Sequence, residues 1–140
     1  MKPLKSIFIM AVLCTIIGCQ SSKSLADKLY NTTWELEYIP GPRIAFNGLF
    51  PNKKPQITFN KDTNNVEGNN GCNGYLADYT LNENNISFGE PGPTTMMYCG
   101  EGEKVFLKTM KQVNKFRFDE EGKLNLMLDD VDMMRFKKVE

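Results

Sequence analysis

The amino-acid sequence predicts a mainly β domain, in which an antiparallel sheet curls into a small barrel or half-barrel with one helix packed on it. Most of the chain beyond residue 32 consists of short segments in which apolar and polar residues alternate, as they do in strands with one buried face. Only residues 101–113 repeat apolar residues convincingly at helical spacing. About seven or eight strands with a single helix favour a sheet that curls, with the helix covering an open side.

The composition excludes several classes of function. The chain has 140 residues, no histidine, and 17 basic against 17 acidic residues, which gives a formal net charge of zero. Without histidine it can form neither a Ser-His-Asp or Cys-His catalytic site nor a histidine-ligated zinc or haem site. The balanced charge offers no basic surface for nucleic acid. We therefore expect one folded domain that does not bind nucleic acid.

The first 18 residues have the features of a bacterial lipoprotein signal peptide. Two lysines precede an apolar run over residues 7–17, which is too short to span a bilayer. The run ends in Ile16-Ile17-Gly18-Cys19, which resembles a lipobox, and cleavage would leave Cys19 as the lipidated first residue. The alternative is a plain signal peptide that is cut nearby and leaves Cys19 as a free thiol.

Residues 19–28 are polar and rich in serine, so we expect a flexible tether between the lipidated Cys19 and a folded domain over residues 29–140. Gln20 follows Cys19, and the absence of aspartate at that position resembles an outer-membrane sorting signal. We therefore expect an exported protein that is lipid-anchored in the cell envelope, at the bacterial outer membrane.

The strands of the domain follow from residues that alternate. Residues 33–38 form the first and residues 57–59 lie in the second, after which residues 60–65 form a turn and Val66 begins the approach to a glycine-rich segment. Residues 75–81 and 86–88 form two more, and three short runs with acidic turns close the chain as a meander. The interior is expected to contain Trp34, Tyr75, Tyr79, Phe88, Phe106, Phe116, Leu126 and Phe136.

The predicted helix over residues 101–113 places an apolar stripe on one side, which includes Phe106 and Met110. Glu101 and Glu103 fall in its first turn, where acidic side chains favour the helix dipole. Its other side carries three lysines, which we expect to be solvated rather than to bind an anion.

Residues 39–55 form a long connection with four prolines, a density that excludes a regular helix or central strand. The apolar side chains in this connection have two interpretations. They cover the end of the core, or they form a binding lip at the barrel mouth for a ligand or partner. The residues of this possible lip are Ile44, Phe46, Leu49 and Phe50.

The acidic residues do not predict a catalytic or metal site. Asp129, Asp130 and Asp132 lie in a predicted hairpin turn, where consecutive acids are usually solvated. Residues 60–65 begin like a calcium loop but lack its glycine and its final glutamate, so a polar turn explains them better. We expect no enzymatic activity, no metal and no cofactor.

The most constrained stretch is residues 68–75, which holds three glycines, three asparagines and one cysteine. Together with the elements around it, this stretch resembles the META domain, or HslJ-like, family of bacterial secreted proteins and lipoproteins. The resemblance covers nearly all of residues 29–139 and implies a small barrel-like fold with a helix and no established enzymatic activity. Its most specific residues are Gly71, Cys72, Asn73, Tyr75, Thr95, Met96 and Cys99, within a set that also includes Trp34-x-Leu36, Ile57-x-Phe59, Glu103-x-x-Phe106 and Leu124-x-Leu126.

The cysteines favour a structural disulfide between Cys72 and Cys99. An exported chain folds where thiols oxidise, and these two remain if Cys14 leaves with the signal peptide and Cys19 carries lipid. A metal site with two thiolates lacks further soft ligands, and a redox pair lacks Cys-x-x-Cys spacing. We therefore expect a staple rather than a reactive pair.

Three functions are compatible with these features. The leading hypothesis is a non-enzymatic, lipid-anchored envelope domain that contributes to stress tolerance or envelope integrity through contacts with an unidentified envelope protein. The second is a small-molecule binding module at the barrel mouth, and the third is an inhibitor of an exported hydrolase that uses residues 39–55 as an inserted loop. In each case we expect a monomer that the lipid anchor holds at the membrane.

Overall fold

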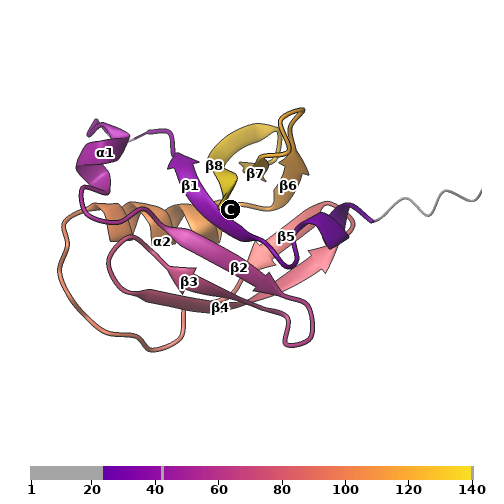
Figure 1. Cartoon of the computed structure of the whole chain (residues 1–140), viewed down its shortest axis with the longest axis horizontal. Helices are drawn as coiled ribbons and strands as arrows, with labels where there is room; N and C mark the ends of the chain where they lie inside the picture. The colour runs from indigo at the N-terminus through magenta and orange to yellow at the C-terminus, as the bar shows by residue number, and fades with distance from the viewer. Residues whose placement is uncertain (1–23, 42, 140) are drawn as a thin grey trace, which may run out of the picture.

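The computed structural model describes residues 24–41 and 43–139 and shows eight strands in one antiparallel sheet that closes on itself (Figure 1). Each strand pairs with its neighbours in chain order, and the last strand pairs with the first. The predicted class, a mainly β domain with a curled antiparallel sheet and one main helix, is confirmed. In chain order the elements are η1 (Leu25–Lys28), β1 (Thr33–Tyr38), α1 (Phe46–Leu49), β2 (Gln56–Asn60), β3 (Asn65–Asn69), β4 (Gly74–Asn82), β5 (Asn85–Phe88), α2 (Gly102–Gln112), β6 (Lys115–Phe118), β7 (Leu124–Leu128) and β8 (Val131–Val139).

Large apolar side chains fill the inside of the sheet. Trp34 in β1, Phe116 in β6 and Phe136 in β8 are all fully buried, because alternate residues of each strand point inward. A barrel of eight strands is just wide enough for such side chains to fill it. All the interior residues expected from the sequence are buried except Phe88, which is partly buried against the same core.

Helix α2 packs its apolar side onto this core, and its observed bounds lie within one residue of the prediction. Phe106 is fully buried and meets the ring of Tyr75 edge-on, with 5.3 Å between the ring centroids. Gly102, the first residue of the helix, has no room for a side chain, because a Cβ atom there would overlap the carbonyl oxygen of Leu49. The start of α2 therefore lies directly against the end of α1.

The short helix α1 is a correction to the sequence analysis. Residues 39–55 were expected to exclude any regular helix, yet Phe46–Leu49 forms one helical turn. The prolines that disfavour helix lie outside these four residues, so a single turn fits between them.

The folded chain also starts earlier than predicted. Ser24 and Asp27 form a capping box around η1, in which the Ser24 Oγ accepts from the Asp27 backbone N–H and the Asp27 carboxylate accepts from the Ser24 N–H. Leu29 is fully buried, and its carbonyl accepts a hydrogen bond of 3.1 Å from the Trp34 indole. The expectation of a flexible tether is therefore wrong for residues 25–28, and residues 19–23 of that tether lie outside the described residues.

Two carboxylates on β1 take part in hydrogen bonds and ion pairs across the sheet. Glu35 accepts a hydrogen bond of 2.8 Å from Gln56, and this bond, aided by Lys137, lowers the pKa of Glu35 below its ordinary value of 4.5. Burial acts to raise the pKa of Glu37, but hydrogen bonds from Lys123 and Arg135 outweigh it and lower that pKa as well.

These lowered pKa values predict a loss of stability in acid. A carboxylate whose pKa is lower in the folded state stabilises that state above the unfolded pKa, and the stabilisation is lost as the pH falls through the folded pKa. We expect the free energy of unfolding to decrease as the pH falls from about 6 to about 3. In the Glu35→Gln/Glu37→Gln variant this decrease should be smaller. Urea unfolding at both pH values measures the free energy of unfolding of the parent and of the variant. An equal pH dependence in these two proteins contradicts the prediction.

Candidate functional site

The structure brings the two most specific motif segments together. Gly71, Cys72 and Asn73 lie in the connection between β3 and β4, whereas Thr95, Met96 and Cys99 lie in the long connection between β5 and α2. The sulfur atoms of Cys72 and Cys99 form a disulfide, with 5.7 Å between the two Cα atoms. The expected pairing is thus present, and it fixes one end of residues 94–99, which we call the anchored loop.

Asparagine side chains shape the β3–β4 connection. The Asn70 side-chain oxygen accepts from the backbone N–H groups of Cys72 (3.1 Å) and Asn73 (2.8 Å), and the Asn69 side chain accepts from Gly71 N–H (2.9 Å). Such bonds mimic the backbone bonds of a turn. Gly71 has a φ of +92°, which glycine adopts without strain. The dense Asn and Gly composition therefore builds a rigid turn.

Asn73 joins this turn to the anchored loop. Its side-chain oxygen accepts from the Met97 backbone N–H (2.9 Å) and the Thr95 hydroxyl (3.1 Å). Its side-chain nitrogen donates to the Met97 carbonyl oxygen (2.9 Å) and to a Glu103 carboxylate oxygen (2.9 Å). Asn73 is only 3% exposed, so these bonds are shielded from water. They fix the backbone of the loop at Met97, two residues before the disulfide.

Glu103 joins the same network to α2. Its Oε1 atom accepts from the Asn73 amide and, at 2.7 Å, from the Asn70 amide. Hydrogen bonds to an ionised acceptor are stronger than bonds between neutral groups. The carboxylate lies in the first turn of α2, where the helix dipole favours negative charge. The turn, the anchored loop and the start of α2 are therefore tied to one another.

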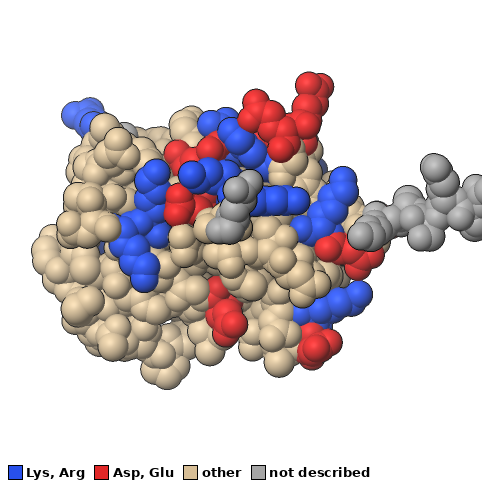
Figure 2. Space-filling view, viewed as in Figure 1, with Lys and Arg blue, Asp and Glu red and all other residues tan. Residues whose placement is uncertain are grey.

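The side chains at the tip of the anchored loop point into solvent. Met96 is 96% exposed, Met97 61% and Tyr98 79%. Three large apolar residues in a row are thus held outside the core on a backbone that Asn73 and the disulfide fix. In Figure 2 the lower left of the face in view, where Figure 1 draws the connection between β5 and α2, carries few charged groups, whereas Lys, Arg, Asp and Glu gather over the upper and right-hand parts.

A shallow groove of about 580 Å³ runs beside the loop. Pro93, Met97 and Leu107 contribute apolar surface to its lining, and Asn73 and Glu103 contribute polar atoms. Grooves that combine apolar lining with a few fixed polar groups are the usual form of binding sites. The groove and the loop tip together form one surface.

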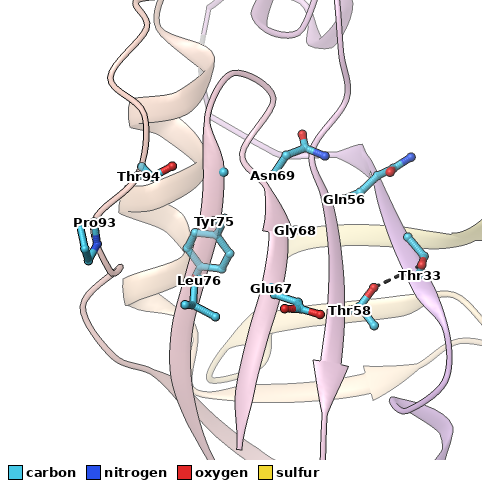
Figure 3. A pocket seen from close by; sticks show the side chains of 11 residues that line it. Thr33, Gln56, Thr58, Glu67, Gly68, Asn69, Tyr75, Leu76, Pro93 and Thr94 are labelled. Carbon is cyan, nitrogen blue, oxygen red and sulfur yellow. Dashed lines mark hydrogen bonds between the residues drawn. The ribbon is translucent and has the colours of Figure 1, made fainter. Parts of the chain in front are cut away.

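A second groove of about 580 Å³ crosses the outer face of β1–β4 (Figure 3). Figure 3 shows Thr33 and Thr58 at one end, where their hydroxyls are 3.2 Å apart, and Pro93 and Thr94 at the other. Gly68 lies between them, and a Cβ atom there would overlap the Gln56 carbonyl oxygen. Pro93 and Thr94 line both grooves, so the first residue of the anchored loop lies where the two grooves adjoin.

Tyr75, the remaining motif residue, belongs to the core rather than to this surface. It is 4% exposed, and burial raises the pKa of its hydroxyl well above the ordinary value. Tyr75 therefore remains protonated at physiological pH and acts as a packing residue against α2.

Most side chains of the possible binding lip in residues 39–55 lie in or against the core. Leu49 and Phe50 are both 4% exposed and belong to the core, where Phe50 lies against Gly71 and Gly102. Phe46 is partly buried, and only Ile44 is mainly exposed. The alternative interpretation, in which these side chains cover the end of the core, is confirmed for Leu49 and Phe50.

Other expectations concern residues that the structure does not describe or that form no site. The signal peptide and Cys19 lie outside the described residues. In residues 24–41 and 43–139 no three Cys, Asp or Glu side chains are grouped so that they could hold a metal ion. Across the same residues, no helix is long and apolar enough to span a membrane.

Two groups of residues in this site have little signal in the sequence. Asn70 and Glu103 are brought together by the fold, since 33 positions separate them, and the sequence indicated Glu103 only as part of the family motif and as an acidic residue of the first helical turn. Met97 and Tyr98 extend an apolar run in a segment without strand or helix period, which could have indicated an exposed surface. The structure gives these residues no helix or strand.

Comparison with known proteins agrees with this fold. The model of a family described as META domain matches residues 27–140. A solved structure, described as the NMR structure of the protein from Burkholderia xenovorans, superposes with a TM-score of 0.61 at 22% identity, over 83% of this chain and 88% of that one. At this identity the likeness concerns the fold alone. No curated protein matches the chain.

Proposed function

The chain belongs to the META domain family, and we propose that it is a lipid-anchored envelope domain that uses the anchored loop as a contact surface for another envelope protein. The family suggests a non-enzymatic, envelope-associated domain. Through this contact the domain would contribute to stress tolerance or envelope integrity. One observation carries the proposal: Met96, Met97 and Tyr98 are exposed on a backbone that is fixed from beneath.

The chemistry of these side chains suits a protein contact. Monomeric proteins rarely expose large contiguous apolar patches unless the patch has a function. Tyrosine is enriched among the residues that dominate binding energy, and methionine adapts its shape to varied partners. A loop that is already ordered loses little conformational entropy when it binds. The disulfide and the Asn73 bonds therefore favour the bound conformation in advance.

The position of the loop suits a tethered protein. In Figure 1 the connection between β5 and α2 lies at the opposite end of the long axis from η1, the first described element. A lipid on Cys19 would hold the η1 end towards the membrane, so the anchored loop would face away from it. A partner in the aqueous space of the envelope would then have free access to the loop.

The other two functions receive less support from the described residues. A ligand at the barrel mouth was expected to contact Leu49 and Phe50, which are core residues. An inhibitory loop in residues 39–55 depends on the same side chains. The packing of residues 39–55 therefore supports neither a ligand site nor an inhibitory loop as well as the exposed side chains of the anchored loop support a protein contact.

In-cell photo-crosslinking tests the proposed contact. We expect a photoreactive aromatic residue in place of Tyr98 to give a discrete protein adduct in intact cells. Added Met96→Asp/Met97→Asp substitutions should reduce that adduct about tenfold or more. The contacts that dominate binding are shielded from water, and a charged side chain there is unfavourable. The matched control places the photoreactive residue at Val131, which is 61% exposed on β8. No adduct from position 98, or the same adduct from position 131, contradicts the proposal.

A further inference from the structure

We propose that Met96 and Met97 form an oxidant-modified site, at which hydroperoxides convert both thioethers to sulfoxides and thereby make the apolar tip of the anchored loop polar. The inference rests on the proposed contact function of this loop and adds a means of regulating it. It depends on three features of the structure: selective exposure, the chemistry of the other sulfur atoms, and the way in which the loop is held.

Exposure distinguishes these methionines from those of the core. Met96 is 96% exposed and Met97 61%, whereas Met110 is 1% exposed and Met134 is fully buried. Methionine oxidation requires the oxidant to reach the sulfur atom, so it follows exposure. A peroxide in the surrounding solution therefore meets the thioethers of the loop tip well before those of the core.

The described cysteines do not compete for the oxidant. Cys72 and Cys99 are already joined as a disulfide, so neither offers a thiolate. The thioethers are then the sulfur groups of the loop that remain to be oxidised. The sulfur lone pair attacks one peroxide oxygen, the O–O bond breaks, and the other oxygen leaves as water or an alcohol. The sulfur loses two electrons, and a sulfoxide reductase with a dithiol donor reverses the change.

The loop is held in a way that tolerates this modification. Asn73 bonds to the backbone N–H and carbonyl of Met97, and the disulfide acts through Cys99, so neither restraint involves a methionine side chain. The side chains of Met96 and Met97 contribute nothing to the buried core. Oxidation therefore changes the chemistry of the surface and leaves the fold intact.

The change is large for an apolar contact. A sulfoxide converts a flexible apolar side chain into a polar one and disrupts methionine-rich interfaces. Two adjacent sulfoxides beside Tyr98 would place polar groups where a partner needs apolar surface. The predicted outcome is a contact that forms in the reduced protein and weakens under oxidative stress.

Peptide mass spectrometry of the purified protein, treated with hydrogen peroxide, tests the site itself. We expect sulfoxide to form at Met96 and Met97 about tenfold or more faster than at Met110 and Met134, with little change in melting temperature. Equal rates at the four positions, or unfolding that accompanies oxidation of the loop, overturn the inference.

Retention on a phenyl matrix tests the change in surface. The treated protein should elute earlier than the untreated one, and incubation with a sulfoxide reductase should restore its retention. The Met96→Leu/Met97→Leu variant has no thioether at either position and keeps only the partly or fully buried methionines of the described residues, so peroxide should shift its retention much less than that of the parent. If the variant shifts as much as the parent, the methionines of the loop are not the site.

The crosslinking experiment separates this inference from the proposed function. If position 98 gives an adduct that falls about tenfold after peroxide treatment of the cells and recovers with reduction, both stand. If the adduct forms but does not respond to peroxide, the inference fails and the contact function stands. If the loop is selectively oxidised but position 98 gives no adduct, the contact function fails, and with it the regulatory meaning of the modification.

Discussion

Replacement of Cys72 by serine is expected to lower the free energy of unfolding by about 3 to 4 kcal/mol. The disulfide joins residues 27 positions apart, and a closed loop of this length restricts the unfolded chain by about that amount in the chain-entropy model. The bond also joins the β3–β4 connection to the anchored loop, so its loss frees one end of the loop. For a domain of this size, the melting temperature should fall by more than about 10 °C.

Thermal and urea unfolding of the oxidised protein, the reduced protein and Cys72→Ser/Cys99→Ser measure this effect. The last two should resemble each other, because both lack the same cross-link, and the same strands should form in all three. A Cys72→Ser protein with an unchanged melting temperature but a lost specific activity would mean that the cysteines are reactive groups and that the structural interpretation is wrong.

Asn73→Ala is expected to have the second largest effect, a loss of about 2 to 4 kcal/mol. The substitution removes hydrogen bonds to both backbone groups of Met97, to the Thr95 hydroxyl and to Glu103. Buried polar groups that lose their partners pay the cost of desolvation without compensation. Because the anchored loop depends on these bonds, the loop should become mobile although the disulfide remains.

Two further variants show whether the loss of stability is specific to the amide side chain at position 73. Asn82→Ala removes an exposed asparagine from β4 and should change the unfolding free energy by less than about 0.5 kcal/mol. Asn73→Asp keeps an acceptor for the Met97 N–H but places a second carboxylate beside Glu103, so it should also destabilise. Equal stabilities of Asn73→Ala and Asn82→Ala would exclude a structural role for the network.

The strands and the main helix are predictable from sequence because the spacing of their apolar residues indicates which side chains are buried. Tyr75, Ala77 and Tyr79 are all buried and alternate with the exposed Leu76, Asp78 and Thr80, and the stripe on α2 places Phe106 in the core. Local spacing carries this information because neighbouring positions of one element face fixed directions. The closure of the sheet, β8 against β1, follows only from the way in which all eight strands twist together.

In the candidate site, local spacing does not predict which apolar side chains are buried. Phe50 and Met96 are both apolar residues in irregular connections, yet one is buried and the other almost fully exposed. Their difference arises from contacts with distant parts of the chain: Phe50 fills the space above Gly71 and Gly102, whereas Asn73 holds the Met96 segment outward. Neither contact leaves a periodic pattern, so the sequence alone does not distinguish the buried Phe50 from the exposed Met96.

Hydrogen exchange at the Met97 amide tests most directly whether the loop is held from beneath. That N–H donates to the buried Asn73 side chain at 2.9 Å, although the Met97 residue itself is mainly exposed. We predict that the Met97 amide exchanges about tenfold or more slowly than those of Met96 and Tyr98, and that Asn73→Ala removes the difference. Exchange at Met97 as fast as at its two neighbours would show that the loop is not fixed, and would contradict the account of an anchored contact surface.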